Sequence, residues 1–400
     1  MSEVRNTLNP ERLEWPSNLP SAVTELWPTS DSKAPEIAHP GIQAPAQPQK
    51  QHATSRQRRH GLLHSVISVM LALACLEFCL RLVSTGLPNL PQPAEFMPSR
   101  GPCSPMITLR QYYEGFSVAH YCSDGGRVTS QLSLRDGPFG VLLGDSFVQA
   151  AQVADDAAAG SLIESIARSE GTAINVRQYG WGGAGVPVYL AVADRINRVL
   201  DPLWIAVVLD QHALGAQGLE ESSYWRGRVN SDLSLAISQA TESGSSSFRF
   251  FAAPSHVFTG LLKRSSLLVS CVYKLRFALH NRAADVLTTS ITPADDQANQ
   301  AIVHSLSRAY GDRLILVYVP QVGIDREEPP MYEESLSSAS RRESVRFVSL
   351  KSDMMRARDS DHQLCTGFAN STPGEGHLNA YGHAVLAKAI LRTVREAAIH

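Results

Sequence analysis

From about residue 140 onward, short apolar runs typical of strands alternate with segments that are apolar on one side only, as in helices. The expected strands are GVLLG, AINVRQYG and LWIAVVLDQH, and the expected helices between them are DDAAAGSLIESIARS and VPVYLAVADRINRVL. The pattern resumes with a helix over 298–310, the strands LILVYVP and VRFVSL, and a final helix over about 377–398. Strands that are apolar throughout and separated by helices indicate an α/β fold, with a parallel sheet covered on both faces.

The alternation is interrupted between about residues 215 and 300. This interval contains the serine-rich stretch ESGSSS and the amphipathic basic stretch LLKRSSLLVSCVYKLRFALHNR. We interpret it as a helical insertion. A helix docked on the domain is the simpler interpretation, and a lid or a segment near a membrane surface is the alternative.

The N-terminal part divides into a polar arm and an apolar segment. Residues 1–60 are rich in proline and lack apolar periodicity, so we expect a disordered arm. Residues 62–83 form an apolar run of about 22 residues, enough to span the ~30 Å hydrocarbon layer. A cleaved signal peptide would lie at the terminus with a shorter apolar core, and a buried soluble helix is rarely apolar on every face. We therefore predict a transmembrane anchor over 61–84.

Charges near this segment predict its orientation. A basic cluster precedes it, whereas basic residues are scarce just after it, which predicts a cytoplasmic N-terminus. Glu77 and Arg81 are spaced i, i+4 near the far end, where such a pair can reach toward the headgroups. The chain is thus expected to be a single-pass protein of the inner (cytoplasmic) membrane. Everything beyond the anchor would be extracytoplasmic, or periplasmic in a Gram-negative bacterium.

Composition and cysteine usage narrow the possibilities further. With 36 basic and 38 acidic residues the net charge is −2, which does not favour nucleic-acid binding. Export makes disulfides possible, and Cys103 with Cys122 is the expected pair because the two are close in sequence. There is no CxxC pair, so we predict no metal and no cofactor. Residues 85–137, rich in Pro, Gly, Ser and aromatic residues, are expected to form an irregular lead-in to a domain over 138–400.

Polar clusters follow three of the expected strands. These are Gly144-Asp145-Ser146, the glycine-rich stretch 180–185, and Asp210-Gln211-His212, while a fourth, GEGHLNAYGH, opens the last helix. Ligands of doubly wound sheets bind at the carboxyl ends of strands, so we expect these clusters to meet there. The nucleophile elbow of α/β-hydrolases needs a glycine two residues after its serine, and Val148 occupies that place.

The motif GDSF after a strand, the glycine cluster, and HLNAYGH near the C-terminus resemble the SGNH (GDSL) hydrolase superfamily. The resemblance covers roughly residues 138–397, and the insertion fits it poorly. The anchor with its Glu77-x-x-x-Arg81 spacing is similar to the single-pass bacterial members. The resemblance implies a flavodoxin-like three-layer α/β/α sandwich.

The same resemblance implies roles for individual residues. Ser146 would be the nucleophile, Gly183 would offer its N–H to the oxyanion, and His377 would be the base. The family's third block, usually Gly-x-Asn-Asp, reads LDQHAL here, so Gln211 would supply the side-chain donor. Its last block is usually Asp-x-x-His, but position 374 is glycine.

The chemistry requires these residue types. A serine hydroxyl becomes nucleophilic when an imidazole takes its proton, and the imidazole needs an acceptor on its second nitrogen. Glu375 is the nearest carboxylate in sequence to His377, and a backbone carbonyl is the alternative acceptor. The backbone N–H groups of Ser146 and Gly183, with the Gln211 amide, would hold the oxyanion.

Other conspicuous side chains have simpler explanations. His383 and His212 are expected to be structural or peripheral rather than ligands. Trp181 and Tyr179 either floor a sugar-binding cleft or pack in the core.

The sequence therefore predicts a membrane-anchored serine esterase or O-acyltransferase. Its expected substrate is an ester-linked acyl group, with acetyl favoured, on an extracytoplasmic glycan or a small ester, and a membrane acyl donor is a possible partner. Hydrolysis and transfer share an acyl-enzyme, and the sequence does not separate them. The alternative is a glycan-binding or assembly protein that keeps this fold with an eroded site, which the departures at Gln211 and Gly374 favour.

Overall fold

A computed structural model describes residues 55–83, 90–100, 105–111, 114–129, 139–172, 174–220, 224–239, 291–324 and 327–399. The predicted disordered arm, apart from residues 55–60, lies outside these ranges. So do residues 240–290 of the predicted insertion.

A parallel five-stranded sheet forms the centre of the fold, in the order β4-β3-β5-β8-β9. Renumbered along the chain, this is the 2-1-3-4-5 order of flavodoxin-like sheets. The α/β prediction is confirmed, and each predicted strand is present. The strands are β3 (Phe139–Gly144), β4 (Asn175–Gly180), β5 (Trp204–Leu209), β8 (Leu314–Tyr318) and β9 (Arg346–Ser349).

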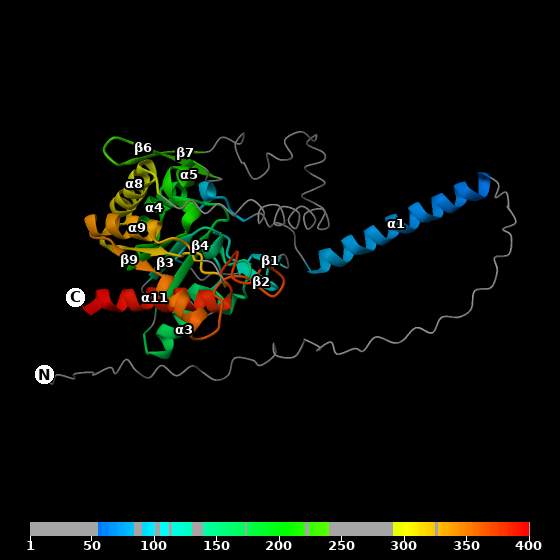
Figure 1. Ribbon diagram of the computed structural model, residues 1–400. Coiled ribbons are helices and arrows are strands. Elements are labelled where there is room, and N and C mark those ends of the chain that lie inside the picture. Colours follow the sequence, from blue (N-terminus) through cyan, green and yellow to red (C-terminus); the bar gives the residue numbers. More distant parts are fainter. Residues whose placement is uncertain are drawn as a thin grey trace, which may run out of the picture. The chain divides into compact units, whose positions relative to one another are not determined.

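Helices cover both faces of this sheet (Figure 1). One face packs on α4 (Val186–Leu200), α8 (Pro293–Tyr310) and α9 (Met331–Arg342). The other packs on α3 (Ala159–Ser169), α10 (Lys351–Asp359) and α11 (Ala380–Ile399).

Successive strand residues face opposite layers, so Leu143 enters the first core and Leu142 the second. Both side chains are fully buried, each contributing about 2 kcal/mol. This two-sided burial explains why β3, β5 and β8 are apolar throughout, whereas the edge strand β4 also contains Asn175, Arg177 and Gln178.

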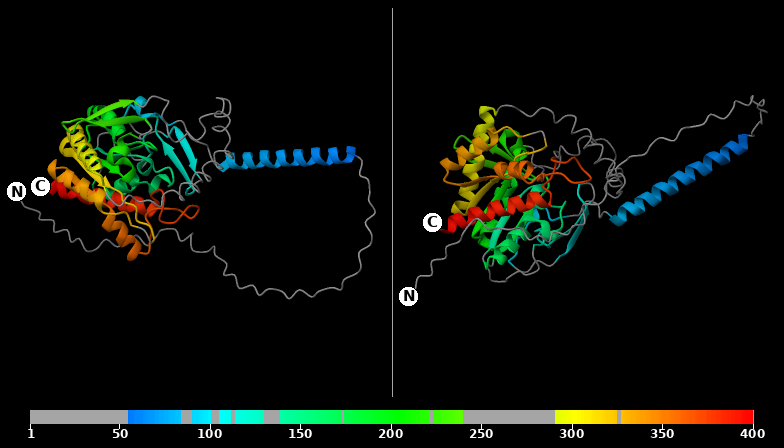
Figure 2. Two further views of the ribbon diagram at one scale, coloured as in Figure 1. Left: turned by 45° about the horizontal axis from the view of Figure 1, so that its top comes forward. Right: turned by 60° about the horizontal axis from the view of Figure 1, so that its bottom comes forward.

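The lead-in contains an antiparallel hairpin of β1 (Ile107–Gln111) and β2 (Ser117–Tyr121). Single bridges join Arg127 to Tyr121 on one side and to Gln178 of β4 on the other. The hairpin is thereby connected to the edge of the central sheet. In both views of Figure 2 it lies beside the loop that precedes α11, although the two segments are far apart in sequence.

The described part of the insertion is not purely helical, which corrects the expectation for 215–300. After the short α5 (Gly215–Glu220), an antiparallel hairpin forms from β6 (Trp225–Val229) and β7 (Leu235–Gln239). The residues between Asn230 and Ser234 make the turn, where the backbone N–H of Asn230 donates to the carbonyl of Ser234 and the Asn230 side-chain Nδ2 donates to Ser234 Oγ. Helix α8 then begins at Pro293 rather than at 298, because Thr292 and Asp295 form a capping box.

The predicted anchor coincides with a single helix, α1 (Ser55–Val83). Over the residues that the structure describes, no helix combines the length and apolar character needed to cross a membrane. The membrane anchor is therefore not confirmed.

The cysteines separate into two groups. Cys122 is disulfide-bonded, whereas Cys75, Cys79 and Cys365 are free. Cys103 lies outside the described residues, so its pairing with Cys122 stays a prediction.

Candidate active site at the carboxyl edge of the sheet

Ser146 is the first residue of the four-residue helix α2 (Ser146–Gln149), directly after β3. Asp145 caps this helix, and its Oδ1 accepts a hydrogen bond of 2.9 Å from the N–H of Phe147. The Ser146 side chain is half-buried. The serine thus lies at the edge of the sheet where the sequence predicted it.

Two glycines make room for this turn. A Cβ on Gly144 would lie 2.3 Å from Val148 Cγ2, and a Cβ on Gly180 would lie 2.0 Å from the nitrogen of Gln149. Because neither residue has a side chain, α2 can pack directly against the ends of β3 and β4. The G of the GDS motif is therefore a packing requirement.

His377 lies in the loop before α11, not in the helix as its predicted start implied, because α11 begins at Ala380. Its Nδ1 is 2.5 Å from Oε2 of Glu114, and its backbone N–H donates to Oε1 of the same carboxylate at 2.8 Å. Glu114 is only 3% exposed. A buried carboxylate thus holds both the ring and the backbone of the candidate base, which leaves Nε2 as the nitrogen free of this pairing.

The carboxylate that contacts His377 differs from the one expected from the sequence. Glu375, chosen because it is close in sequence, is exposed, whereas Glu114 from the lead-in contacts the imidazole. No motif in the sequence marks Glu114. One indirect signal is Gly376, whose φ is +78° and whose Cβ would lie 2.1 Å from Glu114 Oε1. A glycine beside the histidine makes room for that carboxylate.

Asn370 joins the two loops that carry Glu114 and His377. Its Oδ1 accepts from the N–H of Gly115 at 2.8 Å, and its Nδ2 donates to the carbonyl of Gly115 at 3.2 Å. The residue next to Glu114 is thereby fixed to the C-terminal loop in both directions.

The rings of Phe147 and His377 pack edge-on, with centroids 5.8 Å apart. The first and last polar clusters of the sequence are thus neighbours. Among the residues that the structure describes, the Ser146 hydroxyl makes no direct hydrogen bond to the imidazole of His377. Catalytic hydrogen bonds often tighten only when substrate is bound, so this geometry is compatible with a nucleophile–base pair.

The surroundings of His377 shift its pKa. Burial disfavours the imidazolium, but the hydrogen bond and charge of Glu114, helped by Asp145 and Asp210, outweigh it and raise the pKa of His377 above its ordinary value.

Gly183 lies in the turn after β4 and has a φ of +75°, which glycine adopts without strain. The turn is tied to the serine strand because the N–H of Trp181 donates to the carbonyl of Gly144 at 3.2 Å. Trp181 and Tyr179 are 4% and 0% exposed, so they belong to the core and do not floor a cleft.

Gln211 begins a 3-10 turn (Gln211–Ala213) at the end of β5 and is half-buried. The preceding Asp210 is buried and caps this turn, its Oδ1 accepting from the N–H of Ala213 at 3.1 Å. His212 is exposed. Strands β3 and β5 are parallel neighbours, so the Gln211 turn and the Ser146 turn emerge at the same edge.

The two capping carboxyls are both hard to ionise. Burial, followed by the charge of Asp210, raises the pKa of Asp145 to about 7. Burial likewise raises the pKa of Asp210 to about 6, and nearby Glu328 adds to the effect. Below about pH 6 this edge therefore carries less negative charge than its sequence suggests.

His383 matches the expected structural role. It is 1% exposed, and burial together with the charges of Arg127 and His377 lowers its pKa to about 3. It is a neutral core residue at physiological pH. Among the described residues, no three His, Cys, Asp or Glu side chains are grouped to hold a metal ion.

Comparisons with known proteins give structural neighbours only. No family model and no curated protein matches the chain. Similar solved structures include an alpha/beta hydrolase from the metagenome of Lake Arreo, at 15% identity and a TM-score of 0.36, covering 64% of this chain and 95% of that one. A catalytic mutant of an acetylxylan esterase from Geobacillus stearothermophilus has 12% identity, a TM-score of 0.35, and coverage of 67% and 95%.

A psychrotrophic esterase from Pseudoalteromonas sp. is similar at 12% identity and a TM-score of 0.33, over 66% of this chain and 99% of that one. Two of these three neighbours are esterases, and the third is an alpha/beta hydrolase. Likenesses at these TM-scores say nothing of the activity or substrate of this chain.

Proposed function

We propose that the chain is a serine esterase or O-acyltransferase in which Ser146 is the nucleophile, His377 the general base and Glu114 the acid that orients it. The observation that carries the proposal is the buried Glu114–His377 pair, held beside the capped turn that presents Ser146. A glutamate on Nδ1 directs Nε2 toward the reacting groups and stabilises the imidazolium that forms.

The reaction follows from these positions. His377 Nε2 takes the proton as Ser146 Oγ attacks the ester carbonyl, and the tetrahedral oxyanion accepts hydrogen bonds from the N–H groups of Ser146 and Gly183 and the Gln211 amide. Collapse breaks the ester C–O bond, and the imidazolium protonates the leaving alkoxide. The acyl-enzyme is then attacked by water, which gives hydrolysis, or by a sugar hydroxyl, which gives transfer.

The proposed substrate is an acyl ester, with acetyl favoured, of an extracytoplasmic glycan. The GDSF and HLNAYGH motifs support an ester substrate through the resemblance they carry. Transfer and hydrolysis are separated by incubating the enzyme with p-nitrophenyl acetate and a xylo-oligosaccharide. Acetylated sugar would indicate transfer, and free acetate alone would indicate hydrolysis.

Attachment to the cytoplasmic membrane through residues 61–84 is part of the proposal. Two observations support it: basic residues precede the segment, and many apolar side chains of α1 are exposed, among them Met70, Leu71 and Phe78. After carbonate washing, the full chain should stay with the membranes, while a variant lacking residues 1–84 should be released. A reporter active only in the periplasm should be active after residue 400 and silent before residue 55, and the reverse would refute this orientation.

Fluorophosphonate labelling of the purified full-length chain tests the activity itself. Wild type should be labelled, whereas Ser146→Ala should not. Absence of labelling in both proteins, each shown to be folded by circular dichroism, would instead favour the glycan-binding alternative.

A further inference from the structure

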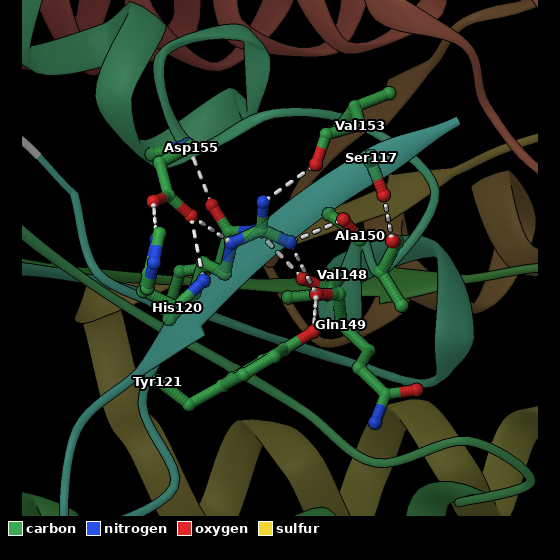
Figure 3. A network of polar contacts seen from close by, with 12 residues as sticks. Ser117, His120, Tyr121, Val148, Gln149, Ala150, Val153 and Asp155 are labelled. Atoms are coloured by element: carbon green, nitrogen blue, oxygen red, sulfur yellow. Dashed lines mark hydrogen bonds and ion pairs between the residues drawn. The ribbon is translucent and has the colours of Figure 1, made fainter. Parts of the chain in front are cut away.

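The buried guanidinium of Arg127 donates hydrogen bonds to the backbone that follows the Ser146 turn. Arg127 is 2% exposed. Its Nη1 donates to the carbonyls of Gln149 (3.2 Å) and Ala150, and its Nη2 donates to the carbonyl of Val153 at 2.7 Å (Figure 3). One side chain from the lead-in thus binds three carbonyls within the few residues after the serine.

An ion pair balances this buried charge. Arg127 Nε donates to Oδ1 of Asp155 at 3.0 Å, and His120 contacts the other oxygen, Oδ2, through Nδ1 at 2.5 Å. The guanidinium also lies over the ring of Tyr121, with its carbon 5.4 Å from the ring centroid. Figure 3 shows Asp155 and His120 on one side of this network and Gln149 and Ala150 on the other.

Other donors bind the same short segment. Tyr121 Oη donates to the carbonyl of Gln149 at 3.0 Å, and Gln178 Nε2 donates to that of Val148 at 2.6 Å. Ser117 Oγ adds a bond of 2.5 Å to the carbonyl of Ala151.

The turn needs such donors for a physical reason. The last four carbonyls of any helix lack partners within it, and α2 has only four residues. The chain then leaves α2 through Ala150 at a φ of +54°, a conformation that costs a non-glycine residue of order 1 kcal/mol or more. Without donors from outside, the turn is free to relax, and the Ser146 hydroxyl and N–H would turn with it.

We propose that Arg127 is a positioning residue for the nucleophile: its guanidinium fixes the carbonyls of the Ser146 turn and so aims the hydroxyl and N–H of Ser146 at the ester. The inference rests on the proposed function. Arg127 is not a catalytic residue, because its guanidinium is bound to the backbone behind the turn.

Arg127→Lys is the variant that isolates geometry, since lysine keeps the charge beside Asp155 but lacks the planar fork of donors. With p-nitrophenyl acetate and full-length protein, kcat should fall about 10- to 100-fold with KM within about twofold, as expected for a misaimed nucleophile. Fluorophosphonate labelling should slow by a similar factor.

Arg177→Lys is the matched control. Arg177 is also a buried arginine, 6% exposed, and lies over the ring of Phe139 toward the other end of the sheet. It should lower the melting temperature comparably and leave kcat per folded molecule unchanged.

Tyr121→Phe keeps the inference testable if the lysine variant does not fold. It removes only the hydroxyl bound to Gln149 and should lower kcat about fivefold, again without a change in KM. Its control is Tyr310→Phe, which removes a buried hydroxyl that donates to the carbonyl of Tyr189 at 2.5 Å and to no carbonyl of the serine turn.

The outcomes separate the two proposals. If wild type reacts while both Arg127→Lys and Tyr121→Phe also react at the wild-type rate, Arg127 is merely structural and the inference is wrong. The same holds if the control variants Arg177→Lys and Tyr310→Phe lose as much kcat as Arg127→Lys and Tyr121→Phe. If wild type neither hydrolyses the ester nor labels, the proposed function fails first and the inference falls with it.

Discussion

Glu114 and His377 are 263 positions apart in the chain, yet one carboxylate binds both the ring nitrogen and the backbone N–H of the histidine. The lead-in before the α/β domain is therefore part of the candidate active site. The triad would then be assembled from the lead-in, the first central strand and the loop before the last helix.

Glu114→Gln should lower kcat by about 10²–10⁴, because an amide cannot stabilise the imidazolium and can hold the ring in the wrong tautomer. Glu375→Gln, the matched control, should stay within about twofold of wild type. Steady-state kinetics with p-nitrophenyl acetate measure both. Equal losses in the two variants would count against Glu114 as the acid.

Gly376→Ala should impair catalysis by displacing Glu114, because the new Cβ would lie 2.1 Å from Oε1 of that carboxylate. We expect a loss of kcat of at least tenfold. Gly171→Ala is the control: Gly171 has the same φ of +78° but no atom within 4 Å of an added Cβ. Comparable melting temperatures with different kcat values would separate displacement of the carboxylate from backbone strain, and equal kcat values would contradict the prediction.

Gln211→Ala should lower kcat by about 10²–10³, with little change in KM, if its amide meets the oxyanion. Gln211→Asn should lose less, since a donor survives with a shorter reach. An alanine variant as active as wild type on an ester that requires Ser146 would show that the third donor is another group.

Two buried carboxyls, those of Asp145 and Asp210, should contribute a decline in stability as pH rises from about 4 to about 7. The folded-state pKa values of Asp145 and Asp210, raised by burial to about 7 and about 6, exceed the ordinary value of 3.8. The folded protein therefore holds protons that the unfolded chain releases, and the stability they contribute is lost as pH rises through these values.

Asp145→Asn should flatten this decline in melting temperature, since asparagine keeps the helix cap without the ionisation. Asp359→Asn is the control, because a hydrogen bond from Arg358 lowers the pKa of Asp359, so its contribution has the opposite sign. Thermal melts of the three proteins from pH 4 to pH 8 measure the slopes. An unchanged slope in Asp145→Asn would refute the assignment.

Local pattern was sufficient for the α/β architecture. The runs around Leu142 and Val207 are apolar at every position because both faces of each strand are buried, and burial acts through residue type, which the sequence displays directly. For the same reason the positions of Ser146 and Gln211 at strand ends followed from where the apolar runs stop. Their roles in an oxyanion site remain predictions.

Only the tertiary structure decided which other groups contact the candidate site residues. Glu114 has no motif, and it reaches His377 because the hairpin of β1 and β2 is connected through Arg127 to the sheet edge, a contact between segments that have no local pattern in common. No motif in the sequence marks Arg127 either, and only folding buries it against the carbonyls behind Ser146. The local sequence determines which residues are close along the chain, whereas the partners of a buried charge depend on which distant segments the fold brings together.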